Sequence, residues 1–442
     1  MISFSSRILV SLSVFIPLGA AWSTSTNTSS NPKQYELCAQ RFVKIGFSDG
    51  ELDDVLQRAT ALLDAASAAS SSCANIVLKR RNSVTSFDDA SLPRAVGVST
   101  DFEKLIATSC VKIVQRITWC GSPIIDGGAL GCSSIPGSAM VVVRTYDGLP
   151  QTFNTGVEPV TWLHEFGHNL GLEHNSVDDL DLMAPGISPE TVHISDEECT
   201  KFSGSQAFAA NGNTNAGAIP LQSVPRVMPA EPNGSQQTTQ TVPLEEFVKR
   251  PLKGAQLVAA ASYGGEVNKA EGLLFDPSFT NFKNNIVGLL AVIGTPDTIP
   301  VLEKLIRTPL SGGANSPDVL AHFAALTTIG AIANRYKLPD DKVNILKRAS
   351  NPQFWDDYVL LSDNLDAGDA KSLVRDLSIQ SVNGYAMTGT MAAKEFLTKA
   401  KSDVNGAAVP EPIRRERTEI LNQAIKLNET SATQGALGAF HN

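Results

Sequence analysis

The feature that most constrains this chain is a group of three histidines, in a sequence that has only six. The segment from His164 to His174 reads H-E-F-G-H-N-L-G-L-E-H and fits the pattern H-E-x-x-H-x-x-G-x-x-H. Positions i and i+4 of a helix share a face, so His164 and His168 can present two imidazole nitrogens to one metal ion. Glu165 follows on the same turn, where it can reach a water on the metal without being a ligand. The spacing favours a metal-binding helix over a helix that is rich in histidine by chance.

The third histidine needs a change of chain direction to join the other two. His174 cannot share their helical face, but Gly171 offers a turn, because glycine ends a helix in the left-handed conformation without a Cβ penalty. Three protein ligands leave a fourth position open to water, which is typical of a catalytic zinc site. We therefore expect one catalytic Zn²⁺ bound by His164, His168 and His174.

The long histidine pattern, followed by a methionine turn, resembles the metzincin clan of zinc endopeptidases. The turn is the sequence D-L-M-A-P-G at 181–186, which begins seven residues after His174. Within the clan, the stretch from His164 to Asn175 is most similar to the adamalysin (reprolysin) branch. The resemblance implies that Met183 packs beneath the histidines as a hydrophobic floor, whereas Met183 taken alone could be ordinary core.

Two positions depart from the pattern of these families. Asn175 stands where the adamalysin branch usually has aspartate, and no tyrosine follows Met183, so the extra tyrosine ligand of astacin-like enzymes is not expected. The resemblance covers roughly residues 35–205. It implies hydrolysis of a protein or peptide substrate, with Glu165 as the general base that takes a proton from water.

The hydrophobic pattern of the first half predicts an α/β catalytic domain, a twisted sheet with the zinc helix packed beneath it. The metzincin resemblance implies that Gly127–Cys132 is the edge strand of this sheet, to which a peptide can add as one more strand. A glycine-rich loop is the alternative for that segment. The other elements expected are a strand at Val43–Phe47, an amphipathic helix through Leu52, Val55, Leu56, Ala59 and Leu62–Leu63, strands at Ile76–Leu78, Val111–Ile117 and Met140–Val143, and the zinc helix at about 157–171.

The N-terminal residues indicate export. Residues 1–21 have the pattern of a secretory signal, with Arg7 before an apolar core at Ile8–Pro17 and small residues at 19–21. The apolar run is short for the alternative, an uncleaved anchor, and no later segment reaches spanning length. We expect a secreted, extracellular protein, or a periplasmic one in a bacterium, without a transmembrane segment. The net charge of −9 argues against nucleic acid as a partner.

The cysteines agree with export. An even number of cysteines confined to one part of an exported chain predicts three disulfides, and a cysteine zinc site lacks any C-x-x-C pair. The adamalysin resemblance implies a Cys132–Cys199 bridge. Sequence alone permits fifteen pairings of six cysteines, and for the other four we expect Cys38–Cys73 and Cys110–Cys120. The six cysteines are Cys38, Cys73, Cys110, Cys120, Cys132 and Cys199.

Composition divides the chain after the zinc protease domain, which is expected at 35–203. Residues 204–243 are poor in hydrophobic residues and rich in Gly, Pro, Ser, Thr and Gln, which predicts a flexible linker. Residues 244–442 are nearly all helix-patterned and hold no metal-ligand cluster. Their two isolated histidines, His322 and His441, are expected to be structural or exposed to solvent and not metal ligands.

The helical part shows weak self-similarity between Leu290–Gly294 and Leu326–Gly330. The first copy leads into a helix at Ile299–Ile306, and Gly389 leads similarly into Ala393–Ala400. Paired helices joined by a glycine turn resemble HEAT-type solenoid repeats. A helical bundle without repeats is the alternative.

Rival functions follow from the size of the helical part, which could bind a protein partner and select the substrate. The protein could instead be a secreted protein-binding module with a vestigial zinc domain, but the intact Glu165 argues against this. A toxin or adhesin, in which cleavage is secondary to receptor binding, is a further alternative. The acidic residues Asp178, Asp179 and Asp181 are a calcium candidate, for which a solvated loop is the simpler interpretation.

Overall fold

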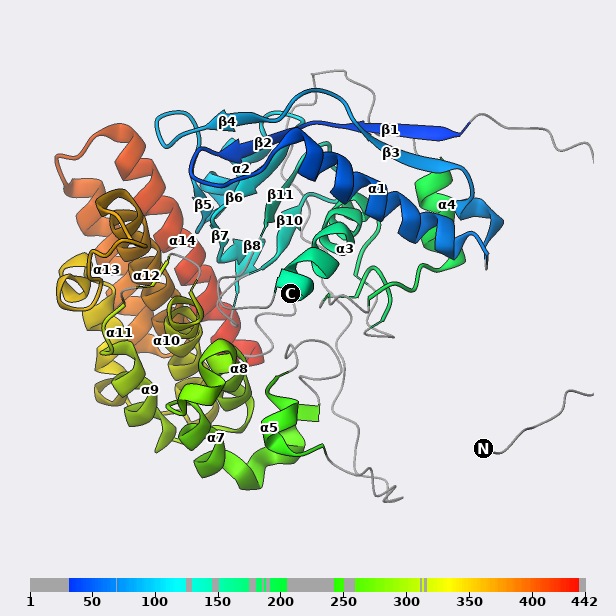
Figure 1. Cartoon of the computed structure of the whole chain (residues 1–442). Helices are drawn as coiled ribbons and strands as arrows, with labels where there is room; N and C mark the ends of the chain where they lie inside the picture. Colours follow the sequence, from blue (N-terminus) through cyan, green and yellow to red (C-terminus); the bar gives the residue numbers. More distant parts are fainter. Residues whose placement is uncertain are drawn as a thin grey trace, which may run out of the picture.

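The computed structural model describes a mixed α/β region followed by an all-helical region (Figure 1). This order confirms the broad fold class predicted from the sequence. The predicted signal peptide lies outside the described residues. So does the predicted linker, except for its ends. None of the helices that the structure describes is long and apolar enough to cross a membrane. The described residues are 32–68, 70–124, 129–144, 151–174, 180–184, 187, 191–204, 242–249, 259–310, 312–313 and 316–436.

The α/β region is built on a five-stranded sheet of order β10-β11-β6-β2-β4, in which only β10 runs antiparallel to its neighbour. A second parallel pair, β1 with β3, directly precedes β2 and β4 in the chain. The predicted strands at Ile76–Leu78, Val111–Ile117 and Met140–Val143 are confirmed, and the second is divided in two. The strands are β1 (Lys33–Leu37), β2 (Ala39–Phe42), β3 (Ile76–Arg80), β4 (Thr85–Phe87), β6 (Val111–Val114), β10 (Gly131–Ser133) and β11 (Met140–Val143), with two small pairs formed by β5 (Ala95–Val96) with β7 (Arg116–Ile117) and by β8 (Trp119–Cys120) with β9 (Ser122–Pro123).

The edge strand that the resemblance implied at Gly127–Cys132 is β10. Gly131 pairs with Val142 of β11 and Ser133 pairs with Met140, which makes β10 the last strand on this side of the sheet. The strand begins later than predicted, and residues 127–128 lie outside the described part. The chain therefore forms an edge strand here and not merely a glycine-rich loop.

Helices cover both faces of the sheet (Figure 1). Helices α1 (Asp49–Ala66) and α3 (Gln151–Asn169) share one hydrophobic core with Met140 and Val142 of β11. On the other face, α2 (Ser99–Ile106) shares a core with Val141 and Val143. Because side chains alternate along a strand, a strand buried on both faces needs this continuous apolar run.

Helix α1 forms where the sequence predicts an amphipathic helix. Ser48 and Glu51 build a capping box, in which the Ser48 hydroxyl accepts from the Glu51 backbone N–H and the Glu51 carboxylate accepts from the Ser48 N–H. The buried face consists of Leu52, Val55, Leu56, Ala59 and Leu63, and Leu62 is partly buried.

The prediction of a strand at Val43–Phe47 is wrong. Strand β2 ends at Phe42, and the Ile45 N–H donates to the Phe42 carbonyl in a turn. The Val43 side chain is 51 % exposed. The apolar residues there belong to the turn that leads into α1. A prediction based on hydrophobicity alone therefore placed a strand where the chain turns.

All six cysteines form disulfides, as predicted, but the predicted partners are wrong. Neither the Cys132–Cys199 bridge implied by the resemblance nor the remaining two pairs occur. The bridges are Cys38–Cys110, Cys73–Cys199 and Cys120–Cys132.

Strand register explains one of the observed bridges, Cys38–Cys110, and helix packing brings the partners of a second together. Cys38 and Cys110 directly precede Ala39 and Val111, which are paired on the neighbouring strands β2 and β6. The other long-range bridge joins a 3-10 helix at Ser71–Cys73 to α4 (Asp196–Gly204), against which it packs. These proximities depend on the sheet and could not be inferred from cysteine spacing.

In the helical region, α8, α10, α12 and α14 lie side by side in that order. The helices predicted at Ile299–Ile306 and Ala393–Ala400 are confirmed within α9 and α13. Gly294 and Gly389 end helices, whereas Gly330 lies inside α10. The helices are α5 (Leu244–Phe247), α7 (Val267–Leu273), α8 (Lys283–Ile293), α9 (Thr298–Ile306), α10 (Pro317–Tyr336), α11 (Asn344–Ala349), α12 (Ala367–Met387), α13 (Met391–Gly406) and α14 (Glu411–Gln434).

The helical region docks on the α/β region through charged side chains of α12. Arg116 of β7 forms an ion pair with Asp376, and the two side chains are only 3 % and 0 % exposed. Arg375 donates to Asp101 of α2, at 3.1 Å from Oδ2. The sequence predicted a flexible linker between the two regions, but the structure places the helical region directly against the α/β region.

Candidate metal centre

Helix α3 and the turn after it build the site. The helix covers Gln151–Asn169, so it begins earlier than the predicted 157. Gly171 follows with a φ of +87°, the left-handed conformation that the sequence predicted for the turn. The Leu172 N–H then donates to the Gly167 carbonyl at 3.0 Å and closes the helix end. This turn brings His174 back to the helix face that carries the first two histidines.

The three predicted ligands converge on one point. His174 Nε2 lies 3.1 Å from His168 Nε2 and 3.3 Å from His164 Nε2, and one nitrogen from each ring lies within 4.8 Å of the others. A tetrahedral zinc ion with bonds of about 2.0–2.1 Å separates its nitrogen ligands by about 3.3 Å. The spacing of the imidazoles therefore fits the ion.

Backbone carbonyls fix the orientation of the two helical histidines. His164 Nδ1 lies 2.6 Å from the Leu182 carbonyl oxygen, and His168 Nδ1 lies 2.7 Å from that of Leu172. A carbonyl only accepts, so each Nδ1 carries the hydrogen and each Nε2 keeps a lone pair directed into the site. His174 can donate one hydrogen at most, and at least two lone pairs consequently face one another. A cation between them removes that repulsion.

Burial supports the neutral form of the ligands. His164 and His168 are 4 % and 5 % exposed, whereas His174 is exposed. Burial lowers the pKa of His168, against the opposing effect of its bond to the Leu172 carbonyl. Neutral imidazole is the form that binds a metal ion. One side of the site is therefore enclosed, and the side of His174 is open to solvent.

Met183 packs against the histidine helix, as the resemblance implied. A Cβ atom on Gly167 would lie 2.8 Å from the Met183 sulfur, so the methionine occupies the space that this glycine leaves. Met183 is buried in the core shared with α3, and its N–H donates to the Glu198 carboxylate at 3.2 Å. The neighbouring Leu182 carbonyl is the acceptor of His164, so the methionine turn also supports a ligand.

Glu165 lies between α3 and the edge strand β10. The Ser133 hydroxyl donates to Glu165 Oε2 at 2.6 Å. A Cβ atom on Gly131 would overlap the Glu165 carboxylate, so the two residues are in direct contact. Gly131 lies within the edge strand expected from the sequence, but the contacts of Gly131 and Ser133 with Glu165 were not predicted, because nothing in the local pattern places these two residues beside the histidine motif.

The remaining predicted residues lie apart from the triad or outside the described residues. Asn175, Asp178, Asp179 and His441 are outside. Asp181 forms an ion pair with His193, which does not favour the calcium interpretation. His322 is buried in the helical region, where Nδ1 lies 2.7 Å from the Asp318 carbonyl oxygen, as expected for a structural histidine.

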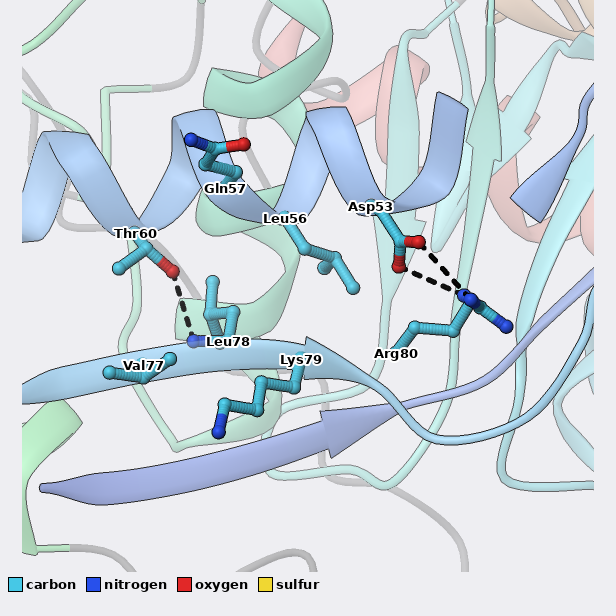
Figure 2. A pocket seen from close by; sticks show the side chains of 8 residues that line it. All are labelled: Asp53, Leu56, Gln57, Thr60, Val77, Leu78, Lys79 and Arg80. Carbon is cyan, nitrogen blue, oxygen red and sulfur yellow. Dashed lines mark hydrogen bonds and ion pairs between the residues drawn. The ribbon is translucent and has the colours of Figure 1, made fainter. Parts of the chain in front are cut away.

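A separate surface groove of 390 Å³ lies between α1 and β3 (Figure 2). An Arg80–Asp53 ion pair and a hydrogen bond from the Leu78 N–H to Thr60 Oγ1 close its walls. No histidine lines it, and neither does Glu165. The groove is therefore distinct from the metal centre.

Comparisons with known proteins give weak matches of structure only. No protein-family model matches the chain, and no curated protein matches it. Archaemetzincin from Methanopyrus kandleri has 17 % sequence identity and a TM-score of 0.27, over 40 % of this chain and 95 % of that one. Metalloproteinase-II from Bacteroides fragilis has 17 % identity and a TM-score of 0.26, over 40 % of this chain and 54 % of that one, so the match spans about half of its length. Likenesses this weak carry no argument about the function.

Proposed function

We propose that this protein is a secreted zinc-dependent endopeptidase. The observation that carries the proposal is the convergence of His164, His168 and His174, whose nitrogens have the spacing of zinc ligands. Glu165 comes directly after the first ligand and stays out of the triad. Three disulfides in the α/β region suit an exported protein.

The chemistry divides between the ion and the chain. A zinc ion on three imidazoles supplies Lewis acidity, which polarises a peptide carbonyl and lowers the pKa of water to about 7. Glu165 accepts the proton of the attacking water and passes it to the leaving amine. The Leu182 and Leu172 carbonyls keep His164 and His168 in the tautomer that the ion needs.

The sheet edge supports an extended peptide as substrate. Within the described residues, β10 pairs only with β11 and leaves its second side beside the site. A substrate strand can add there through backbone hydrogen bonds.

We propose that residues 244–442 form a HEAT-like scaffold that binds a protein substrate or partner, separate from the protease domain at 35–203 and the linker at 204–243. The side-by-side order of α8, α10, α12 and α14 supports a repeating arrangement. A non-repeating bundle remains the competing description.

Substitution of the proposed base and of a ligand tests this function in the full chain. We expect Glu165→Gln to keep zinc and to lower kcat on a short peptide at least about 100-fold, because general-base catalysis contributes that much. His168→Ala should lose zinc and hydrolysis together, as should a wild-type protein treated with a chelator. Zinc is measured by elemental analysis and hydrolysis with a fluorogenic peptide.

The matched control is Glu173→Gln, the same substitution on an exposed glutamate of the same segment. It should leave both zinc and rate unchanged. Hydrolysis by Glu165→Gln at the wild-type rate would contradict the assigned base. A wild-type protein that binds zinc but cleaves no peptide would favour the protein-binding alternative.

A further inference from the structure

The strand that borders the site also contacts the proposed base. Gly131 and Ser133 are alternate residues of β10, so their side chains project from the same face of the strand, toward α3. The bond from Ser133 Oγ to Glu165 Oε2, at 2.6 Å, has the length of a charge-assisted O–H···O⁻ hydrogen bond. Gly131 lies directly against the same carboxylate. The carboxylate occupies the space that a Cβ atom on residue 131 would fill.

The strand that makes these contacts is itself fixed. Gly131 and Ser133 pair with Val142 and Met140 of β11. Cys132 between them faces the opposite core and is bonded to Cys120. Strand pairing and the disulfide therefore fix the backbone that carries the Ser133 hydroxyl. A hydroxyl fixed in this way can restrain the Glu165 side chain, which is long and has several rotamers.

We infer that Ser133 is a positioning residue for Glu165 and that Gly131 is required to leave room for the carboxylate. The inference rests on the proposed peptidase function and adds to it the hydrogen bond that orients the base. A peptide added to β10 and a base bonded to β10 share one reference strand. A common strand would therefore set the position of the substrate relative to the base.

Removal of the hydroxyl tests the role of Ser133 in the zinc-loaded full chain. We expect Ser133→Ala to lower kcat on a short peptide about 10- to 100-fold, since small misplacements of a catalytic group have effects of this size. KM and zinc content should stay within about twofold, as positioning acts on the chemical step. Ser133→Thr keeps the hydroxyl on a strand and should restore most of kcat. Ser134→Ala, one residue on, is the matched control and should resemble wild type.

Crystal structures of the same proteins give a readout that does not depend on activity. In Ser133→Ala the Glu165 carboxylate should leave its wild-type position or occupy more than one, while the three histidines stay in place. Gly131→Ala should displace the carboxylate by direct overlap. Thermal unfolding establishes that each variant is folded before its rate is compared.

Two results would overturn the inference. One is a Ser133→Ala protein with wild-type kcat, and the other is a Glu165 side chain that keeps its single position without the hydroxyl. If the wild-type protein binds zinc but cleaves no peptide, the proposed function fails, and the crystallographic comparison alone then decides whether Ser133 fixes Glu165.

Discussion

At the scale of single residues, α3 holds a second buried carboxylate besides Glu165. Burial raises the pKa of Glu158 from 4.5 to about 7, and the nearby Arg144 and Arg58 only partly oppose this. The Arg144 Nε atom is 3.5 Å from Glu158 Oε1, too far for a close ion pair. Glu158 is therefore a group that the fold prefers in its neutral form.

The sign of its effect on stability follows from linkage. The pKa of folded Glu158 exceeds the unfolded value, so its contribution to stability is fully present below pH 4.5 and is lost as pH rises through about 7. Glu158→Gln removes the charge at every pH. We expect the free energy of unfolding of the variant, relative to wild type, to rise across this interval by up to about 3 kcal/mol.

Urea unfolding at pH 4.5, 6 and 8 measures this difference. The control is Glu103→Gln on the exposed surface of α2, for which the difference from wild type should not vary with pH. A constant difference for Glu158→Gln as well would show that the buried carboxyl does not couple to folding.

The sequence predicted those residues of the site that one local motif contains. His164, His168, Glu165 and the turn at Gly171 follow from helical periodicity and glycine conformation. Ser133 could not be predicted, because its contact with Glu165 depends on how the sheet edge meets α3. The bond of His164 to the Leu182 carbonyl could not be predicted either, because every residue has a carbonyl and the sequence does not show which one lies near the ring.

At the scale of elements, α10 and α12 approach each other through two glycines. A Cβ atom on Gly330 would overlap the Gly384 carbonyl, and one on Gly384 would overlap the Leu326 carbonyl. Backbone meets backbone at this crossing, so no flexible side chain can move aside. The close approach of α10 and α12 therefore depends on both glycines.

We predict that Gly330→Ala destabilises the protein by about 1–3 kcal/mol through overpacking. The matched control is Gly272→Ala in α7, where a Cβ atom would meet nothing within 4 Å. Gly272 is exposed, and its substitution should raise the free energy of unfolding by up to about 1 kcal/mol, because alanine is the better helix former. Urea unfolding compares the two variants, and equal or greater stability of Gly330→Ala would contradict the close crossing.

Elements with strong periodicity were predictable, and those defined by pairing were not. The spacing from Leu52 to Leu63 gives α1 directly, and its capping box marks the start. The run at Val43–Phe47 has the composition of a strand, yet the neighbouring strands end before it. The disulfide partners were mispredicted for a related reason: they are set by how strands and helices meet in the folded protein and not by distance along the chain.

At the scale of the whole molecule, the contact between the two regions is polar and partly buried. Arg116 of β7 lies against the Phe323 ring of α10, with its centre 5.0 Å from the ring, and forms an ion pair with Asp376. Arg375 bridges Asp101 of the α/β region and Asp376. From the sequence these are ordinary charges on separate domains, so the docking could not be predicted.

The last prediction concerns this contact. Asp376→Ala removes a buried partner of Arg116 and leaves its guanidinium enclosed, which should cost about 3–5 kcal/mol of unfolding free energy. The comparison variant is Lys44→Ala. Lys44 is itself well exposed and pairs across the interface with Asp366 and Asp369, and Asp369 keeps its pair with Arg94 when the lysine is removed, so stability should change much less. Urea unfolding is followed for both variants in the full chain. If Asp376→Ala unfolds like Lys44→Ala, the buried pair does not hold the regions together, and a tethered scaffold becomes the better description. If the predicted loss is found, the buried pair holds the helical region fixed beside the α/β region, and a substrate of the proposed peptidase would have to fit beside both.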